Sequence, residues 1–514
     1  MRSLLLDYVF IFATLALFKP VEKLVTRRTR PVSPYSRISL IKFGTLAALS
    51  VLLASQVTWE ALSPTGEIHS FIVFLVAMIA WKCITSDYDV ALPRVPFRAK
   101  LALGLATALT YVQPCFIGVF LYISINYLGG WVHHTHLPMR ILKMFLAYCT
   151  VYALVHALVT VSEPASSMSF WFLVILFQAS HYFVPGVAKL RLGKHWYSWI
   201  VENRTYYIAA IAYATGWLQF LTPKTYLQLP KLLKPLNRFL NIMTIFVECM
   251  SVFSATNRVV CLVLIVGYCV FNLVIFSASG ILFWEYMATN VWLLLYFAGL
   301  DANTANTLFT VPNGILLAAI LVLFPLQKRI WAPSPLAWWE TPFAHRVDWR
   351  ATGLSGQVYG LYNDFMSPHE RQYGQDYGYF LTDEKIVTLN LGSVYDENAR
   401  DAIIASKGDA TALAAIKDKF GKSEWNATLA AEHEEYMVRF CKALNRGARK
   451  NILPAWLRWL KAPGGHWYYW GDAPRFHRQE LIKQVNIYFR EFYYDEDSNQ
   501  ILNIKRILIK TINI

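Results

Sequence analysis

Charged residues are scarce in this sequence, and acidic residues are the scarcer kind. Only 16% of the 514 residues are charged, with 33 Asp and Glu against 48 Lys and Arg. Soluble domains carry about 25% charged residues, so this composition argues against an ordinary soluble globular protein. With 56% hydrophobic and 15% aromatic residues, the chain is expected to be an integral, multi-pass membrane protein with an attached water-facing part.

Several catalytic and binding motifs are absent. The sequence contains no G-x-x-x-x-G-K-[ST], no G-x-S-x-G and no H-E-x-x-H, so ATP-driven transport and serine or zinc hydrolysis lack direct support. Its seven cysteines form no C-x-x-C pair, which gives no sign of a zinc knuckle or a thioredoxin-like site. We interpret them as small buried residues. No segment has the alternating pattern of an outer-membrane barrel.

The net charge of +15 raises the question of nucleic acid as a partner. No array of Lys and Arg with interleaved aromatic residues occurs in a polar region, so no nucleic acid partner is expected. Basic loops that flank apolar segments explain the excess better, through the positive-inside tendency and attraction to anionic lipid. Membrane lipids are therefore the expected partners.

Long apolar runs predict an all-α polytopic bundle in residues 1–330. A span needs about 20 mostly apolar residues, and the runs amount to about eight to eleven transmembrane helices. The run at Leu101–Tyr127 is either one tilted helix or two pieces broken near Pro114. The expected spans are Leu4–Phe18, Leu40–Val57, Phe71–Ile84, Leu101–Tyr127, Ile141–Val161, Phe170–Val187, Tyr207–Leu221, Phe239–Phe253, Val259–Phe276, Ile281–Phe297 and Leu308–Leu323.

Loop charges give an expected orientation. The loops from Lys19 to Lys42 and from Lys82 to Lys100 are basic, which favours the cytoplasmic side for both and the far side for the N-terminus. If each run is one span, the cations between Lys189 and Arg204 fall on the far side, against the rule. Such an exception would suit cations that are kept for a purpose.

Residues 331–514 have a different character. Charged residues are mixed throughout, and no apolar run is long enough to span a membrane. Asp409 to Arg449 has helical spacing interrupted near Gly421 and Ser423, and Asn499 to Ile514 is near-alternating, as in an edge strand. We expect a C-terminal extramembrane domain, either mixed α/β or α-rich.

The segment from His181 to Trp196 combines cations, histidines and aromatic residues at the end of an apolar run. An ionisable group at such a place is costly unless it is solvated, paired or used. Two interpretations of Lys189 stay open. It extends to the headgroups, as lysines at helix ends often do, or it is desolvated and acts as a base.

The same segment carries a family resemblance. Tyr182-Phe-Val-Pro-Gly186-Val-Ala-Lys189-Leu190, followed by Trp196, resembles the signature of the HTTM superfamily, the membrane domain shared with vitamin K-dependent γ-glutamyl carboxylases. A helix with Glu248, Phe253 and Arg258 and the run around Gly280 follow in the family's order. The resemblance covers roughly Tyr152 to Leu300.

The resemblance implies a lysine base at Lys189 and chemistry driven by a reduced quinone. The sequence departs from the family at three places: Ala188 replaces the first lysine of the carboxylase pair, Cys269 and Asn272 occupy the region of the family's histidine, and Pro185 replaces a small residue. Carboxylase activity as such is therefore not expected.

Together these observations predict an HTTM-like membrane protein, and our first hypothesis is an enzyme that acts on a lipid or quinone-like substrate. The predicted catalytic residues are Lys189, His181, His195 and Glu248. The alternative is a non-enzymatic transporter or assembly scaffold, in which the cations only anchor helices. No repeat of the kind common in transporters is evident.

Three further groups are candidates of lower rank. His133, His134 and His136 approach metal-ligand spacing, but one such tract makes a polar turn the preferred interpretation and no metal site is predicted. Glu285 invites a basic partner, with Arg258 and Lys189 as candidates. The aromatic segments with Asp364, His369 and Glu370, and Gly464 to Trp470, are interpreted as interfacial packing turns.

Overall fold

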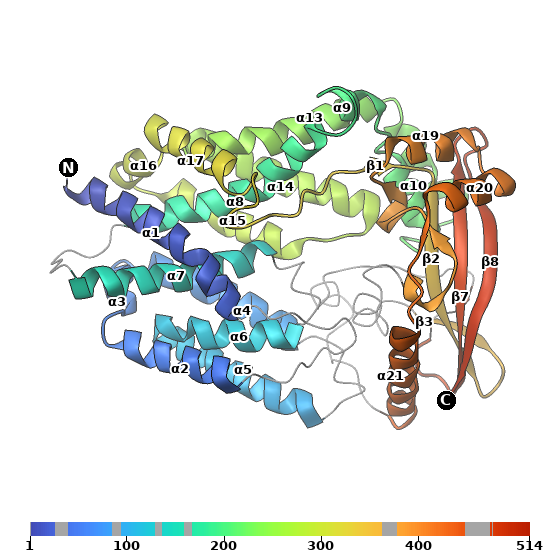
Figure 1. Ribbon diagram of the computed structural model, residues 1–514, viewed down its shortest axis with the longest axis horizontal. Helices are drawn as coiled ribbons and strands as arrows, with labels where there is room; N and C mark the ends of the chain where they lie inside the picture. Colours follow the sequence, from blue (N-terminus) through green and yellow to red (C-terminus); the bar gives the residue numbers. More distant parts are fainter. Residues whose placement is uncertain are drawn as a thin grey trace.

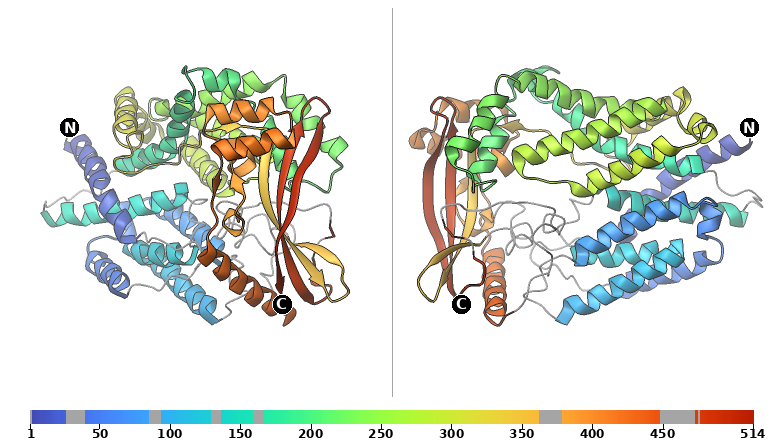
Figure 2. Two further views of the ribbon diagram at one scale, coloured as in Figure 1. Left: turned by 45° about the vertical axis from the view of Figure 1, so that its right-hand side comes forward. Right: turned by 180° about the vertical axis from the view of Figure 1, so that it is seen from behind.

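The computed structural model describes residues 2–25, 40–84, 94–128, 136–158, 167–361, 378–447, 473–474 and 476–514. Long helices lie side by side in one part of the molecule, and an antiparallel sheet stands across one end of them (Figure 1). The N-terminus lies at the opposite end of the helical part. Both views in Figure 2 show the same separation of the helical part from the sheet.

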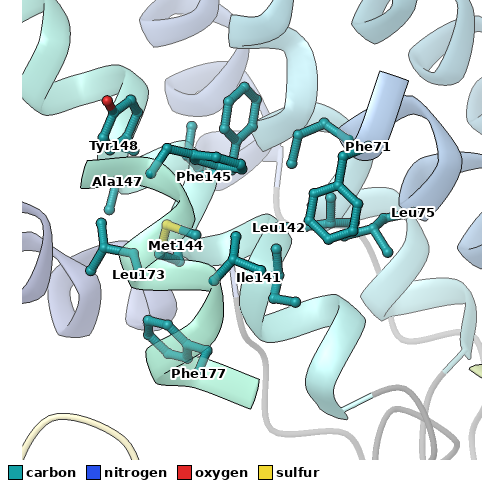
Figure 3. Packing of buried hydrophobic residues seen from close by; sticks show 14 of the residues in the cluster. Phe71, Leu75, Ile141, Leu142, Met144, Phe145, Ala147, Tyr148, Leu173 and Phe177 are labelled. Atoms are coloured by element: carbon teal, nitrogen blue, oxygen red, sulfur yellow. The ribbon is translucent and has the colours of Figure 1, made fainter. Parts of the chain in front are cut away.

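The first half of the helical part comes from uniformly apolar segments, as expected of helices buried among others or in lipid. Their bounds are α1 Arg2–Val25, α2 Leu40–Ala54, α3 Trp59–Leu62, α4 Glu67–Ile84, α5 Arg94–Val112, the 3-10 turn η2 Pro114–Phe116, α6 Ile117–Leu128, α7 His136–Leu158 and α8 Ser167–Leu190. Figure 3 shows how side chains of α4, α7 and α8 interlock in its core: Phe71, Leu75, Ile141, Leu142, Met144, Phe145, Ala147, Tyr148, Leu173 and Phe177.

The second half mixes short and long helices. Gly280 ends the longest of them with a φ of 72°, a left-handed cap that a side chain would oppose both conformationally and by contact with the ring of Trp217. The bounds are α9 Ser198–Glu202, α10 Tyr207–Ala214, α11 Pro223–Tyr226, α12 Gln228–Leu233, α13 Asn237–Met250, η4 Ser251–Phe253, α14 Arg258–Ser279, α15 Trp284–Gly299, α16 Ala302–Leu308 and α17 Val311–Leu323.

Among the described residues, four helices are long and apolar enough to cross a membrane, and the number rises to six if two bent pairs each count as one span. This is compatible with a multi-pass membrane protein. The number of candidate spans is below the eight to eleven expected, because several apolar runs fold as shorter helices such as α2, with 15 residues, and α6, with 12. The four are Glu67–Ile84, Leu137–Ala157, Ser167–Leu190 and Arg258–Ser279; the bent pairs are Pro223–Leu233 with Asn237–Phe253 and Ala302–Leu308 with Val311–Leu323.

The expected span Tyr207–Leu221 is wrong. Helix α10 has eight residues and is therefore about 12 Å long, too short to cross a bilayer core of roughly 30 Å. Its Ala210 and Ile211 are fully buried in a cluster that also contains Ala344 and Tyr494 of the C-terminal part. Helix α10 thus joins the helical part to the sheet.

The run Leu101–Tyr127 is broken at Pro114 into two antiparallel helices. Gln113 at the end of α5 donates to the carbonyl of Ala54 at the end of α2, 2.7 Å away. Ser124, late in α6, lies beside Cys83 at the end of α4, with 4.0 Å between the cysteine sulfur and the serine carbonyl oxygen. Helix α5 therefore ends at one end of the bundle, and α6 runs back to the other.

This reversal corrects the expected orientation of the Lys189 loop. Arg140, in the first turns of α7, contacts His181 in the second half of α8, and Lys143 contacts Glu22 near the end of α1. The ends of α1, α4, α6 and α8 therefore meet at one end of the bundle. The cations from Lys189 to Arg204 lie at the same end as the helix termini that flank the basic loops, so they do not oppose the charge rule.

The sheet has the order β3-β2-β7-β8 with antiparallel neighbours. The expected edge strand at Asn499–Ile514 is confirmed as β8, and the helical stretch from Asp409 divides at Gly421 into two helices, also as expected. The bounds are β1 Trp339–Glu340, β2 Phe343–Gly353, β3 Val358–Leu361, β4 Lys385–Ile386, β5 Ser393–Val394, β6 Lys422–Ser423, β7 Ile482–Asp495, β8 Gln500–Asn513, α19 Glu397–Ala405, α20 Ala410–Phe420 and α21 Ala427–Asn445, with 3-10 turns at Tyr379–Leu381 and Asn390–Gly392.

Both faces of strand β2 are covered, which explains why its eleven residues are almost all buried. Helix α21 packs on one face, where Met437 and Phe440 meet Trp349 and Val347 in one core cluster. Helix α10 packs on the other face at Ala344. The sheet is thereby fixed to the end of the bundle at which α8 terminates.

Candidate functional site

Several residues of the candidate site lie in a row along one face of α8. Gln178, Tyr182, Gly186 and Lys189 follow one another at spacings of four, four and three residues, which places them on the same side of a helix. Gln178, Tyr182 and Lys189 are all buried. The row faces α13, α14 and α15, and it ends where the sheet joins the bundle.

Lys189 forms a buried ion pair with Glu248 of α13. Its ammonium nitrogen donates to both carboxylate oxygens, at 2.8 and 2.9 Å, and the two side chains are 9% and 4% exposed. The ring of Trp199 lies 5.7 Å from the same nitrogen. Of the two interpretations left open, headgroup contact is therefore replaced by desolvation and pairing. The predicted residues Lys189 and Glu248 are brought together.

Gly186 explains why α13 comes so close to this part of α8. A Cβ atom built on Gly186 would lie 2.9 Å from both the Cys249 sulfur and the Glu248 Cβ, closer than real Cβ atoms approach other atoms. A larger residue would force the two helices apart one turn before Lys189. The glycine of the motif is thus a packing requirement of the ion pair.

A third charged side chain, Glu340 of β1, enters from the C-terminal part. Its backbone N–H donates to the side-chain oxygen of Asn203 at 3.0 Å, and Trp338 donates its indole N–H to the Glu340 Oε1 at 3.1 Å. The Oε2 atom is buried without a hydrogen-bond partner among the described residues. Burial raises the pKa of Glu340 to about 7, and the nearby Asn203 and the positive charge of Lys189 oppose that shift.

Tryptophan side chains lie beside both Lys189 and Glu340. Trp199, whose ring faces the Lys189 ammonium, donates its indole N–H to the carbonyl of Trp338 at 2.9 Å. This hydrogen bond connects α9 of the helical part to the segment that leads into β1. The candidate site therefore lies at the junction of both parts of the molecule.

Further into the bundle, Tyr182 organises a polar network. Asn272 of α14 and Asn290 of α15 both donate amide N–H groups to its hydroxyl oxygen, at 3.3 and 3.1 Å. Gln178 in turn donates to Asn290 at 2.7 Å. The Tyr182 ring stacks on Tyr268 with 3.6 Å between the ring centroids. This network fixes α8 against α14 and α15.

His181 belongs to a different face of α8. Its Nδ1 lies 2.8 Å from the carbonyl oxygen of Phe177, and its Nε2 lies 2.8 Å from a guanidinium nitrogen of Arg140. Since a carbonyl only accepts and a guanidinium only donates, Nδ1 carries the proton and Nε2 accepts. The structure does not bring His181 into the Lys189 pair.

His195 lies on the turn after α8 and is exposed. Its ring stacks on Tyr197 with 5.2 Å between the centroids, and its backbone N–H donates to the hydroxyl of Ser198. Neither contact connects it to Lys189 or Glu248. Of the predicted catalytic residues, only those two share a site.

Glu285, for which Arg258 and Lys189 were the candidate partners, pairs with Lys82 instead. The two side chains are fully buried and in contact at the start of α15 and the end of α4. Arg258 donates to the carbonyls of Phe297 and Ala298 at the other end of the bundle. Sequence spacing could not find this pair, since some 200 residues separate Lys82 from Glu285.

The remaining candidates fall largely outside the described residues. This is so for His133 and His134, for Asp364, His369 and Glu370, and for the segment from Gly464 to Trp470. Within the described part of the chain, no group of three or more His, Cys, Asp or Glu side chains is placed to hold a metal ion.

Sequence reasoning missed Glu340 and Asn203. Both lie in short polar segments beside tryptophans, where nothing in the local pattern separates a buried carboxylate from an exposed one. The run of Trp338 and Trp339 before Glu340 was a usable signal, because a carboxylate flanked by large apolar rings is more often shielded from water.

Comparisons with known proteins add no assignment. No protein-family model, no curated protein and no solved structure matches this chain.

Proposed function

We propose that this chain is a multi-pass membrane enzyme in which the Lys189–Glu248 pair transfers a proton to or from a lipid or quinone-like substrate. The observation that carries the proposal is the burial of this pair at the end of an apolar helix. Taking two charges out of water costs several kcal/mol per ion, roughly, and their attraction returns that cost only in good geometry. Ionisable groups in such surroundings are usually functional.

The proposed chemistry uses the pair as a proton reservoir. Transfer of one proton from the Lys189 ammonium to Glu248 leaves a neutral amine beside a carboxylic acid. The amine then takes a proton from an O–H or an activated C–H of the substrate, and the re-formed ammonium stabilises the substrate anion. Glu248 keeps the first proton until the substrate or solvent accepts it. An apolar site supports this exchange because it narrows the energy gap between the ionic and neutral pairs.

The packing around the Lys189–Glu248 pair indicates the side from which a substrate would reach it. On the side of Gly186 the pair is closed, because Cys249 and the Cβ of Glu248 fill the space. Trp199, Trp338 and Glu340 form the other side, and we place the substrate there. A reduced quinone, which the HTTM resemblance implies, would offer the O–H from which the Lys189 amine takes a proton. The partnerless Oε2 of Glu340 fits as an acceptor for its hydroxyl group.

A scaffold is the second candidate function, and one observation favours it. Contacts between the helical part and the C-terminal part are numerous and ionic: Glu496 accepts from Arg204 at 2.9 Å and from Tyr206 at 2.8 Å, and Arg400 contacts Glu202 at 3.0 Å. On this alternative, the Lys189–Glu248 pair is a further structural ion pair that holds α8 to α13.

The deciding experiment compares two double variants of the full chain purified in detergent. Native mass spectrometry of the wild type first identifies a retained lipid or quinone, and its conversion is then measured. Lys189→Met/Glu248→Leu replaces the pair by apolar groups of similar size, which keeps packing without charge. Lys82→Met/Glu285→Leu makes the same replacement at the pair to which we assign no chemistry.

The acid–base proposal expects the first variant to fold and to lose turnover by at least about 100-fold, while the second keeps it. If the first variant folds, retains the bound molecule and turns it over at the wild-type rate, the enzymatic proposal fails and the scaffold is favoured. If the wild type retains no lipid or quinone above the level of the detergent background, the proposed substrate class is wrong.

A further inference from the structure

Helices α11, α12 and α13 form a sharply bent segment at one edge of the bundle. The stretch Pro223–Leu233 meets the stretch Asn237–Phe253 at an angle of 68°. Pro235 lies in the short connection, and a proline cannot donate the backbone hydrogen bond that a continuous helix needs. Because α13 runs along the bundle (Figure 1), α11 and α12 lie across its end. We call residues 223–239 the elbow.

Apolar packing and hydrogen bonds fix the inner side of the elbow. Tyr226 and Leu227 are buried in the cluster that joins α10 to the sheet, and the ring of Tyr226 stacks on Tyr213 of α10 with 4.8 Å between the centroids. Asn237 at the start of α13 donates to the carbonyl of Asn203 at 2.7 Å. The outer side of the elbow is therefore presented in a defined arrangement.

The outer side interleaves cations with large apolar side chains. Leu232, Leu236 and Phe239 are 65%, 47% and 58% exposed. Lys231 and Arg238, each adjacent in sequence to one of these residues, are exposed as well. Water suits the cations but not the apolar groups, whereas the boundary between headgroups and acyl chains suits both.

The elbow carries more positive charge than its surroundings neutralise. No Asp or Glu occurs in the sequence over residues 203–247. Lys234 contacts Glu496 of the C-terminal part at 3.1 Å. The other cations of the elbow pair with no carboxylate in the part of the chain that the structure describes: Lys224, Lys231 and Arg238. Their charge is complementary to an anionic surface.

Beyond the elbow, α13 turns an apolar face outward. Ile242, Met243 and Phe246 are exposed and follow Phe239 at three, four and seven residues, which places them on one side of the helix. Helix α14 lies beside α13 and extends this apolar surface with a row of exposed side chains: Val259, Val263, Val266, Val270, Leu273 and Val274. Such a surface suits acyl chains, so the elbow lies where the acyl chains give way to headgroups.

We propose that the elbow is a binding surface for anionic lipid headgroups. Lys224, Lys231 and Arg238 contact the phosphates, and the exposed leucine and phenylalanine side chains lie among the upper acyl chains. The occupant is a bilayer lipid, because a free anion would leave these apolar groups in water. The inference also assigns the sheet to the side of the anionic leaflet. It does not depend on the chemistry of the Lys189–Glu248 pair.

Lipid selectivity of the full chain tests this inference. The protein is reconstituted in nanodiscs with equimolar phosphatidylcholine and phosphatidylglycerol, released, and examined by native mass spectrometry for the ratio of the two retained lipids. The wild type should retain phosphatidylglycerol in excess. Each cation near an anionic surface favours binding by about fivefold, so Lys224→Gln/Lys231→Gln/Arg238→Gln should lower the ratio by at least about tenfold. Because all three side chains are exposed, the variant should fold.

Two further triple variants serve as controls. Lys224→Arg/Lys231→Arg/Arg238→Lys keeps the charge of the elbow and should retain the wild-type ratio. Lys419→Gln/Lys422→Gln/Lys442→Gln removes three exposed cations of the C-terminal part, the same change in net charge, and should also retain it. Added sodium chloride should lower the wild-type ratio, because salt screens exposed charges.

Three results would overturn the inference. The first is that the wild type retains the two lipids in the proportion of the nanodisc. The second is that the glutamine variant of the elbow keeps the wild-type excess of phosphatidylglycerol. The third is that both glutamine variants lose the excess equally, since the net charge of the protein, rather than the elbow, would then select the lipid.

Discussion

Two lysine–glutamate pairs lie at the same end of the helical bundle, and they differ in what surrounds them. Lys82 and Glu285 are fully buried, and the Lys82 nitrogen lies 5.9 Å from the ring of Trp284. Lys189 and Glu248 keep 9% and 4% of their side-chain surface exposed, and Trp199 lies at a similar 5.7 Å. The ammonium, carboxylate and indole are common to both.

The difference is a second carboxylate. Glu340 approaches Lys189 from the C-terminal part, and one of its oxygens lacks a hydrogen-bond partner among the described residues. The Lys82 pair is sealed among helices, which suits a structural role. The Lys189 pair has a neighbouring group able to exchange protons and a border with a second part of the molecule. Burial alone therefore does not distinguish a structural ion pair from a functional site, whereas a third ionisable side chain beside the pair does.

Breaking the sealed pair should have the largest effect. Lys82→Met leaves the Glu285 charge buried without its partner, and we expect a loss of about 3–5 kcal/mol in the free energy of unfolding. Thermal unfolding of the purified protein in detergent measures it. The double variant Lys82→Met/Glu285→Leu should recover most of the loss. Unfolding of the single variant at the wild-type temperature would show that the pair is not structural.

Glu340 should make the stability contributed by the Lys189 site depend on pH. Its pKa is raised from 4.5 to about 7 in the folded protein, so the folded state binds more protons than the unfolded state between these values. Stability should therefore fall as pH rises from about 4.5 to about 7 and stay level above, by about 3 kcal/mol in total.

The difference between wild type and Glu340→Gln isolates this contribution, because the other titrating groups are common to both. The variant should lack the fall and be the more stable protein at pH 8. Parallel stability curves for the two proteins across this range would remove Glu340 as the distinguishing feature of the site.

Gly186→Ala should damage the Lys189 pair alone. The added methyl group meets Cys249 and Glu248 at 2.9 Å, and such overpacking costs typically about 1–3 kcal/mol. Gly104→Ala is the control, because nothing lies within 4 Å of that Cβ position in α5. It should be neutral or stabilising by up to about 1 kcal/mol. Equal unfolding temperatures for both variants would mean that α8 and α13 are not closely packed.

The smallest effect is expected at His195. Its ring is exposed on the turn after α8, so His195→Gln should change the free energy of unfolding by no more than about 0.5 kcal/mol. Turnover of any substrate identified for the Lys189 site should also stay at the wild-type level. A clear loss of turnover would place His195 in the site after all and extend the site beyond the buried pair.

Local patterns predicted local structure well. The near-alternating end of the chain forms β8, and the break at Gly421 separates α20 from α21. For the run from Leu101 two alternatives were left open, and the structure has the one with a break at Pro114. In each instance the deciding interactions lie within a few residues along the chain.

Long-range relations were predicted poorly. The prediction of a span at Tyr207–Leu221 was wrong because the apolar side chains of α10 pack against Ala344 of the sheet. An apolar segment has the same composition whether it is buried in lipid or in a protein core. The orientation of the Lys189 loop failed because one helix reversal, at Pro114, changes the side of every later helix. The partner of Glu285 was missed because Lys82 is distant in sequence.

The sequence by itself determined that this protein is rich in apolar helices, that Lys189 ends one of them, and that a polar C-terminal part follows. These features depend on composition and on short periods, which each segment carries with it. Only the tertiary structure decided that Lys189 meets Glu248, that Glu340 stands beside them, and that α12 turns sharply into α13. Such relations depend on helix reversals and strand register, which are set by the packing of the whole chain.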